Sequence, residues 1–164
     1  MPKRGTTKFL SKKQEKKVAK DLKGREVIAS GAIWSAKADV RSDAFLCECK
    51  TTEKEYYRLT PITWAKIRDE AVKDGIRLPI MCIEVKDTQL GVIRLAVFNN
   101  NELELFGKET ISKVVLTTRA LRVDKNMLKG ATEYKYSVGV YPPVFVTVCS
   151  WDLFLEKAEE KELI

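Results

Sequence analysis

Residues 38–50 carry the pattern that most limits how this chain can fold. They read Ala-Asp-Val-Arg-Ser-Asp-Ala-Phe-Leu-Cys-Glu-Cys-Lys, so two short apolar runs flank a polar triplet at 41–43. This arrangement predicts a β-hairpin. Because side chains alternate along a strand, Glu48 and Lys50 should share one face, about 6.5 Å apart. Asp39 on the preceding strand should lie across from them, which brings two carboxylates and an ammonium group together.

The charges of this cluster suggest a chemistry. Two neighbouring carboxylates repel each other and tend to take up a proton unless a cation neutralises them. Hard oxygen ligands favour Mg²⁺ or Mn²⁺, and a lysine beside the metal can stabilise the charge that builds up in phosphodiester hydrolysis. Acidic and basic residues also alternate on the solvent face of many strands. From the bare pattern, both a hydrolytic site and a solvated strand face remain open.

The composition restricts the class of protein. A chain of 164 residues with 45% hydrophobic content suits one folded domain, 1–164, and its mixed helix and strand patterns predict an α/β fold. The net charge of +7 and the pI near 9.2 favour a polyanionic partner, although solubility explains part of the lysine excess. No apolar run of about 18 residues and no apolar leader is present, so we expect a cytoplasmic protein without a membrane span.

The sequence contains no histidine. This removes histidine metal sites and the usual Ser-His and Cys-His nucleophiles, and it leaves carboxylates, Lys, Tyr, Ser or Cys for any catalysis. Each cysteine lies within or beside an apolar run, where a free thiol behaves as a small buried hydrophobe: Cys47, Cys49, Cys82 and Cys149. The closely spaced pair Cys47 and Cys49 lacks a second such pair, so zinc is not favoured.

A basic helix is expected at residues 11–22, with Ser11 as N-cap and Gly24 as C-cap. Glu15 lies at the edge of its narrow apolar stripe. The lysines that cover the rest of the helix form either a phosphate-contacting surface or a solvated face, and we favour the first: Lys12, Lys13, Lys16 and Lys17.

A second helix is expected to begin at Pro61 with Thr60 as N-cap and to end at Gly75. Its expected apolar side comprises Ile62, Ala65, Ile67, Ala71 and Val72. Just before it, Tyr56 and Tyr57 can cover apolar surface or stack on a base, and we favour covering.

The remaining patterns predict strands and one further helix. Strands are expected at 25–34, leading to a turn at Ser30-Gly31, and at 78–85, 91–98, 113–117, 134–140 and 144–149. Residues 119–129 are expected to be partly helical. A final helix is expected to start at Trp151.

Taken in this order, the chain resembles the archaeal-type Holliday junction resolvases and their phage relatives, which belong to the PD-(D/E)xK nuclease superfamily. The resemblance covers about residues 10–98. It rests on the following features: the basic helix with Glu15, the strand ending at Ser30-Gly31, Asp39, Glu48-Cys49-Lys50-Thr51, and residues 58–71. It implies a mixed central β-sheet flanked by helices in a restriction-endonuclease-like core, a family-variable extension at 101–143, and a closing strand and helix at 144–164.

The resemblance also implies roles for residues. Asp39 and Glu48 match the metal-binding acids, Lys50 the catalytic lysine, and Glu15 the acid that completes the site. The backbone carbonyl of Cys49 matches a further metal ligand. Ser30 matches a serine near the scissile phosphate, and Ser35 competes for this role. Lys37 joins the helix lysines as a candidate DNA contact. Ala38 stands where the superfamily motif names proline.

The implied activity is Mg²⁺-dependent resolution of four-way DNA junctions by paired nicks, carried out by a homodimer without a small-molecule cofactor. Mn²⁺ is an alternative metal. The candidate interface residues are Trp34, Leu103, Leu105 and Phe106. Two other functions stay open: another PD-(D/E)xK nuclease of the restriction or repair type, and a nucleic-acid-binding module in which the acid cluster is structural.

Overall fold

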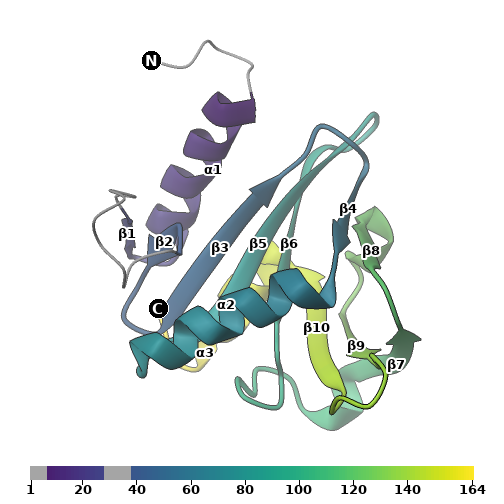
Figure 1. Cartoon of the computed structure of the whole chain (residues 1–164). Coiled ribbons are helices and arrows are strands. Elements are labelled where there is room, and N and C mark those ends of the chain that lie inside the picture. The colour runs from purple at the N-terminus through teal and green to yellow at the C-terminus, as the bar shows by residue number, and fades with distance from the viewer. Residues whose placement is uncertain (1–6, 28–37) are drawn as a thin grey trace.

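Figure 1 shows the computed structural model of the chain, which describes residues 7–27 and 38–164. Within these ranges the fold is α/β, with a mixed eight-stranded sheet in the order β1-β2-β3-β5-β6-β10-β9-β7 and a separate pair, β4-β8. The helices are α1 (Thr7–Asp21), α2 (Pro61–Asp74) and α3 (Trp151–Glu160). The strands are β1 (Arg25–Glu26), β2 (Val40–Arg41), β3 (Phe45–Thr51), β4 (Tyr56–Leu59), β5 (Leu78–Asp87), β6 (Gly91–Phe98), β7 (Ile111–Thr117), β8 (Leu121–Asp124), β9 (Ala131–Tyr136) and β10 (Val144–Ser150). No helix in the described ranges is long and apolar enough to cross a membrane.

The hairpin expected around residues 41–43 is confirmed. β2 and β3 pair antiparallel, with Val40 opposite Cys47. Ser42 closes the turn, because its N–H donates to the carbonyl of Phe45 and its hydroxyl accepts the Phe45 N–H. β3 then pairs in parallel with β5, and α2 lies in the connection between these two strands. A parallel pair requires such a crossover, so this part of the chain forms a βαβ unit.

The two faces of the sheet carry separate cores. Phe45 and Cys47 of β3 point toward the side covered by α1 and α3, where Val18 and Phe154 join them. Leu46 points to the other side and packs against α2. The alternation predicted for β3 is therefore confirmed. In Figure 1, α2 lies in front of the sheet and α3 behind it.

Helix α2 has the predicted ends, but only part of the predicted apolar face, Ile67 and Ala71, is buried. The Thr63 N–H donates to the Thr60 hydroxyl, and Gly75 ends the helix in the left-handed region with φ 77°. Trp64, Ile67 and Ala71 face the sheet, whereas Ile62 and Val72 of the expected face are exposed. The residues at i, i+3 and i+7 from Trp64 form one stripe, and burial of the large indole selects this stripe.

Helix α1 begins at Thr7, four residues before the expected N-cap Ser11. At its other end Lys23, not Gly24, adopts the left-handed conformation with φ 53°. The N–H of Gly24 still caps the helix by donating to the carbonyl of Ala19. Gly24 is needed for another reason: a Cβ there would lie 2.4 Å from the carbonyl oxygen of Arg41.

The segment 101–143 extends the main sheet. β10 pairs antiparallel with both β6 and β9, and β7 pairs in parallel with β9. The prediction that 119–129 is partly helical holds only for one 3₁₀ turn at Lys125–Met127, whereas Leu121–Asp124 forms β8 against β4. Pairing with β4 buries Leu121 and Val123, which share one face of a strand because they are two residues apart.

Three of the expected interface residues belong to the core. Leu103, Leu105 and Phe106 are buried in the cluster that contains α1 and α3. Asn100 holds their loop inward, because its side chain accepts from the N–H groups of Leu105 and Phe106. These residues are therefore unavailable for a dimer interface. Trp34 lies outside the described residues.

Candidate functional site

Asp39 lies immediately before β2, beside β3, and is partly buried. Its N–H donates to the carbonyl of Cys47, and its carboxylate accepts the N–H of Cys49 at 2.8 Å. Burial raises the pKa of Asp39 to about 6, and the negative charges of Glu48 and Glu15 add to this rise. The structure therefore brings the three predicted acids near one another from α1, the start of β2, and β3.

Lysines neutralise the two glutamates. Lys50 Nζ lies 2.9 Å from Glu48 Oε1, and Lys12 Nζ lies 2.7 Å from Glu15 Oε2. The hydrogen bond to Glu15 raises the pKa of Lys12. Burial, the largest single influence, lowers the pKa of Lys50, but the hydrogen bond to Glu48 and the charges of Glu48, Tyr57 and Asp39 together raise it above its usual value. Both lysines are therefore cationic at neutral pH. Each forms an ion pair with a glutamate that the resemblance assigns to metal binding.

The donor set matches a hard divalent cation in its chemistry. In the described ranges no three acid or thiol side chains, as they stand, lie close enough together to enclose a metal ion. Asp39 and Glu48 nevertheless supply two mutually repelling carboxylates, which is the charge pattern that a cation relieves. The backbone carbonyl oxygen of Cys49, next to Glu48 on β3, is a third candidate ligand. Metal binding would require Glu48 to exchange its contact with Lys50 for the ion.

The charge of Asp39 should cost stability when no metal is bound. In the presence of EDTA we expect Asp39→Asn to increase the free energy of unfolding at pH 8 by about 1–2 kcal/mol. This corresponds to a rise in melting temperature of about 5 °C. The amide oxygen can still accept the Cys49 N–H. Because the folded-state pKa is raised, the penalty on wild type is absent below about pH 4, grows as the pH rises toward 6 and is complete above it.

Calorimetric scans of both proteins from pH 4 to pH 8 test this expectation. Saturating Mg²⁺ should stabilise the wild type more than the variant and so reduce their difference. Equal melting temperatures across the pH range in EDTA would show that Asp39 carries no such penalty.

Gln14 is the site residue that the sequence analysis missed. Its side chain is 2% exposed, and its amide donates to the carbonyls of Lys50 and Cys82 at 3.0 and 2.9 Å. It thereby fixes α1, and with it Glu15, across β3 and β5. One signal was present in the sequence: Gln14 lies four and eight residues before Val18 and Leu22, on the stripe that faces the core.

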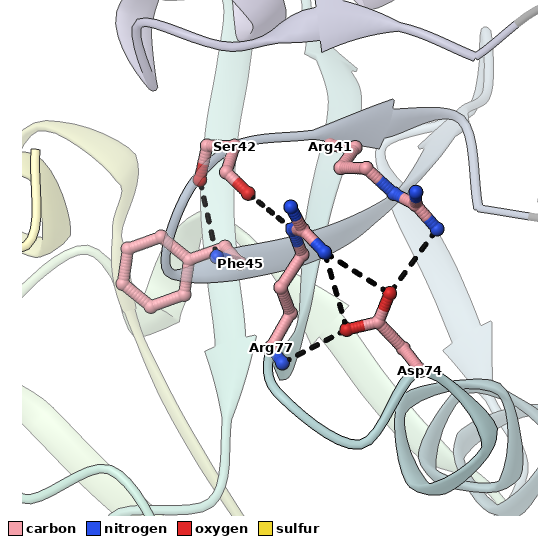
Figure 2. A network of polar contacts seen from close by, with 5 residues as sticks. All are labelled: Arg41, Ser42, Phe45, Asp74 and Arg77. Carbon is pink, nitrogen blue, oxygen red and sulfur yellow. Dashed lines mark hydrogen bonds and ion pairs between the residues drawn. The ribbon is translucent and has the colours of Figure 1, made fainter.

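The turn of the hairpin is anchored to the end of α2, as Figure 2 shows. Asp74 accepts from the guanidinium groups of both Arg41 and Arg77, at 3.1 and 3.2 Å. Arg77 Nε also donates to the carbonyl of Ser42. The Asp74 side chain is only 5% exposed. This network fixes β2, and therefore Asp39, relative to α2.

The four lysines of α1 that were predicted to contact phosphates are all exposed. Lys12 and Lys17 are in addition paired within the helix, Lys12 with Glu15 and Lys17 with Asp21. Lys13 and Lys16 take no part in these pairs. Ser30, Ser35 and Lys37 lie outside the described residues. Tyr57 packs against the core on the α2 side, as favoured, and Tyr56 lies under the guanidinium of Arg122 at 4.2 Å.

We expect Lys13 and Lys16 to set the salt dependence of the DNA binding that the sequence predicts. If each contacts one phosphate, replacing Lys13 and Lys16 by Gln lowers the slope of log K against log salt by about 1.8 in total on duplex DNA. Fluorescence anisotropy over a series of salt concentrations measures this slope.

The matched control replaces Lys108 and Lys129, which are exposed beside β7 and β9 at the opposite edge of the sheet. It removes the same charge and should leave the slope near that of the wild type. Equal slopes for both double variants would show that α1 is a solvated face.

With the geometry described, the chain can be compared with known proteins. It matches no protein-family model, no curated protein and no solved structure. Its function therefore has to be argued from the site itself.

Proposed function

We propose that this chain is a Mg²⁺-dependent endonuclease of the PD-(D/E)xK type that cuts branched DNA, with the four-way junction as its substrate. The observation that carries the proposal is that Glu15 and Glu48 lie near enough to Asp39 to raise its pKa, while Lys50 pairs with Glu48. These residues come from three different elements. A lysine-rich helix borders the acids, as a site for a polyanionic strand requires.

The proposed roles follow from the chemistry of each side chain. Asp39, Glu48 and the Cys49 carbonyl hold the metal ion, which supplies a Lewis acid and an activated water when it is bound. Lys50, released from Glu48, stabilises the negative charge that develops on the phosphate. Glu15 completes the acid cluster, and Lys12 keeps it oriented before substrate binds.

The order of elements supports this proposal. Helix α1 precedes three strands in antiparallel contact, β1, β2 and β3, and α2 then leads to β5 in parallel with β3. This arrangement is compatible with the restriction-endonuclease-like core that the resemblance implies. The strands β7, β9 and β10 extend the same sheet on the side away from the acids.

Paired nicking would require two copies of the chain. One chain supplies one acid cluster, and a closed twofold dimer presents the same surface twice to a junction with twofold symmetry. The proposed enzyme is therefore a homodimer on its substrate. Sedimentation of the protein bound to a junction should give two chains for each DNA.

The decisive experiment compares a four-way junction with a linear duplex of the same sequence during a Mg²⁺ titration. Metal-dependent nicks on opposite strands of the junction, with little cutting of the duplex, support the proposal. Equal cutting of both substrates supports a restriction-like or repair nuclease with the same residues. Junction binding without cutting at any concentration of Mg²⁺ or Mn²⁺ supports a binding module, in which Lys12 and Lys50 neutralise the acids permanently.

A further inference from the structure

A small cleft opens beside the acid cluster, on the face of the sheet that α2 covers. Its volume is about 200 Å³. The residues that shape it are Glu48 and Lys50 of β3, Tyr57 of β4, and Ile62, Lys66 and Glu70 of α2. This volume is below the range of about 300–1,000 Å³ typical of sites for drug-sized ligands. The cleft can hold one small group, and Lys50, the lysine assigned to the reaction, is part of its lining.

The lining of the cleft separates into two parts. Tyr57, Ile62 and Ile67 provide an aromatic and aliphatic surface, whereas Lys50 and Lys66 provide two cations. A pocket for phosphate alone would not contain the carboxylates of Glu48 and Glu70 or this apolar surface. A nucleotide presents both matching parts, because its base has apolar faces with N–H and amino donors at the edge, and its phosphate is anionic.

Ile62 stands out at the rim of this cleft. It is 81% exposed on the first turn of α2, although an isoleucine of this size gains most when it is buried. Exposed aliphatic side chains at a DNA surface can press between base steps and unstack them. Ile76, two residues beyond the C-terminal end of α2, is 80% exposed and is not among the residues that line the cleft. It provides a matched comparison for Ile62.

Resting on the proposed nuclease function, we propose that this cleft receives a single unpaired base next to the scissile phosphate. Tyr57 and Ile62 contact the faces of the base, and Lys66 contacts its phosphate. The site thereby prefers branched DNA to a continuous duplex, because unstacking one nucleotide requires less free energy at a branch point. The selected substrate class is a strand with an unstacked nucleotide at the cut.

The test measures binding in EDTA, so that it does not depend on cleavage. Four-way junctions carry one abasic residue, moved stepwise along each strand through the branch point. Wild-type protein should lose about 10-fold in affinity at one position in each of the two strands that the dimer cuts, the size expected for one base stacked on an aromatic side chain. The variants Tyr57→Leu and Ile62→Ser should each bind the intact junction more weakly than wild type does. Removing this base should not weaken their binding further. Ile76→Ser should behave as wild type at every position.

The outcomes separate the two proposals. If no abasic position weakens wild-type binding, or if Tyr57→Leu and Ile62→Ser lose equally on intact and abasic junctions, the base pocket is wrong even when Mg²⁺-dependent cutting is observed. If the abasic pattern appears without cutting in Mg²⁺ or Mn²⁺, the pocket stands and the nuclease proposal fails. Circular dichroism of Tyr57→Leu checks its fold, and Ile62→Ser alters only an exposed side chain.

Discussion

Glu48→Gln should reduce junction cleavage by about 10³-fold and leave junction binding nearly unchanged. The substitution keeps the size of the side chain and removes one of the two charges that the proposed metal site requires. A metal ion contributes several kcal/mol to transition-state stabilisation, which corresponds to a loss of this size. Affinity rests on many phosphate contacts, so one carboxylate has little influence on it. Single-turnover cleavage and anisotropy measure the two quantities separately.

Glu53→Gln is the matched control. Glu53 lies five residues further along the chain and makes only an exposed contact with Lys86 at 3.3 Å. It should cut at the wild-type rate. Asp39→Asn and Lys50→Ala should resemble Glu48→Gln, because they remove the other charges of the cluster. Near-normal cutting by any of these three variants would show that the reactive group lies elsewhere.

Asp74→Ala should lower the free energy of unfolding by about 3 kcal/mol and the melting temperature by about 10 °C. Removing the carboxylate leaves Arg41 and Arg77 partly buried and without the charge that joins them. The loss of stability should depend on pH. Burial raises the pKa of the Asp74 carboxyl, but the N–H and guanidinium of Arg77 hold this pKa below its usual value. The stabilisation is therefore complete above about pH 4 and is lost as the pH falls through the lower folded-state pKa.

Asp69→Ala is the control for this prediction. Asp69 is an exposed acid on the same helix, so its removal changes the net charge equally and should shift stability by less than about 0.5 kcal/mol. Urea unfolding at pH 7 and pH 3 gives both comparisons. A difference between Asp74→Ala and wild type that persists unchanged at pH 3 would mean that the lost packing, not the charge, causes the effect.

The arrangement of the hairpin and the acids was predictable because it depends on local rules. Strand alternation fixes which way Phe45 and Glu48 point, and the caps at Thr60 and Gly75 fix the ends of α2. These patterns are short, and each is complete within a few residues of sequence.

The rest of the fold depends on contacts between distant segments, which local patterns do not contain. Trp64 takes the buried face of α2 because β5 and β6 provide the surface for it, and Ile62 is displaced outward. Residues 121–124 form a strand because β4 offers an open edge. The role of Gln14 depends in the same way on two carbonyls, one of them 68 residues away.

The contacts of Gln14 also determine when the acid cluster can form during synthesis. Helix α1 leaves the ribosome before β3 and β5, because synthesis proceeds from the N-terminal side. Glu15 of this helix is fixed beside Asp39 only after the Gln14 amide has bonded to the carbonyls of Lys50 on β3 and Cys82 on β5. These contacts close large loops, so we expect them to form late in folding. An unfinished chain would then carry the acids without their arrangement, and the proposed nuclease would stay inert until the strand at residues 78–87 is in place.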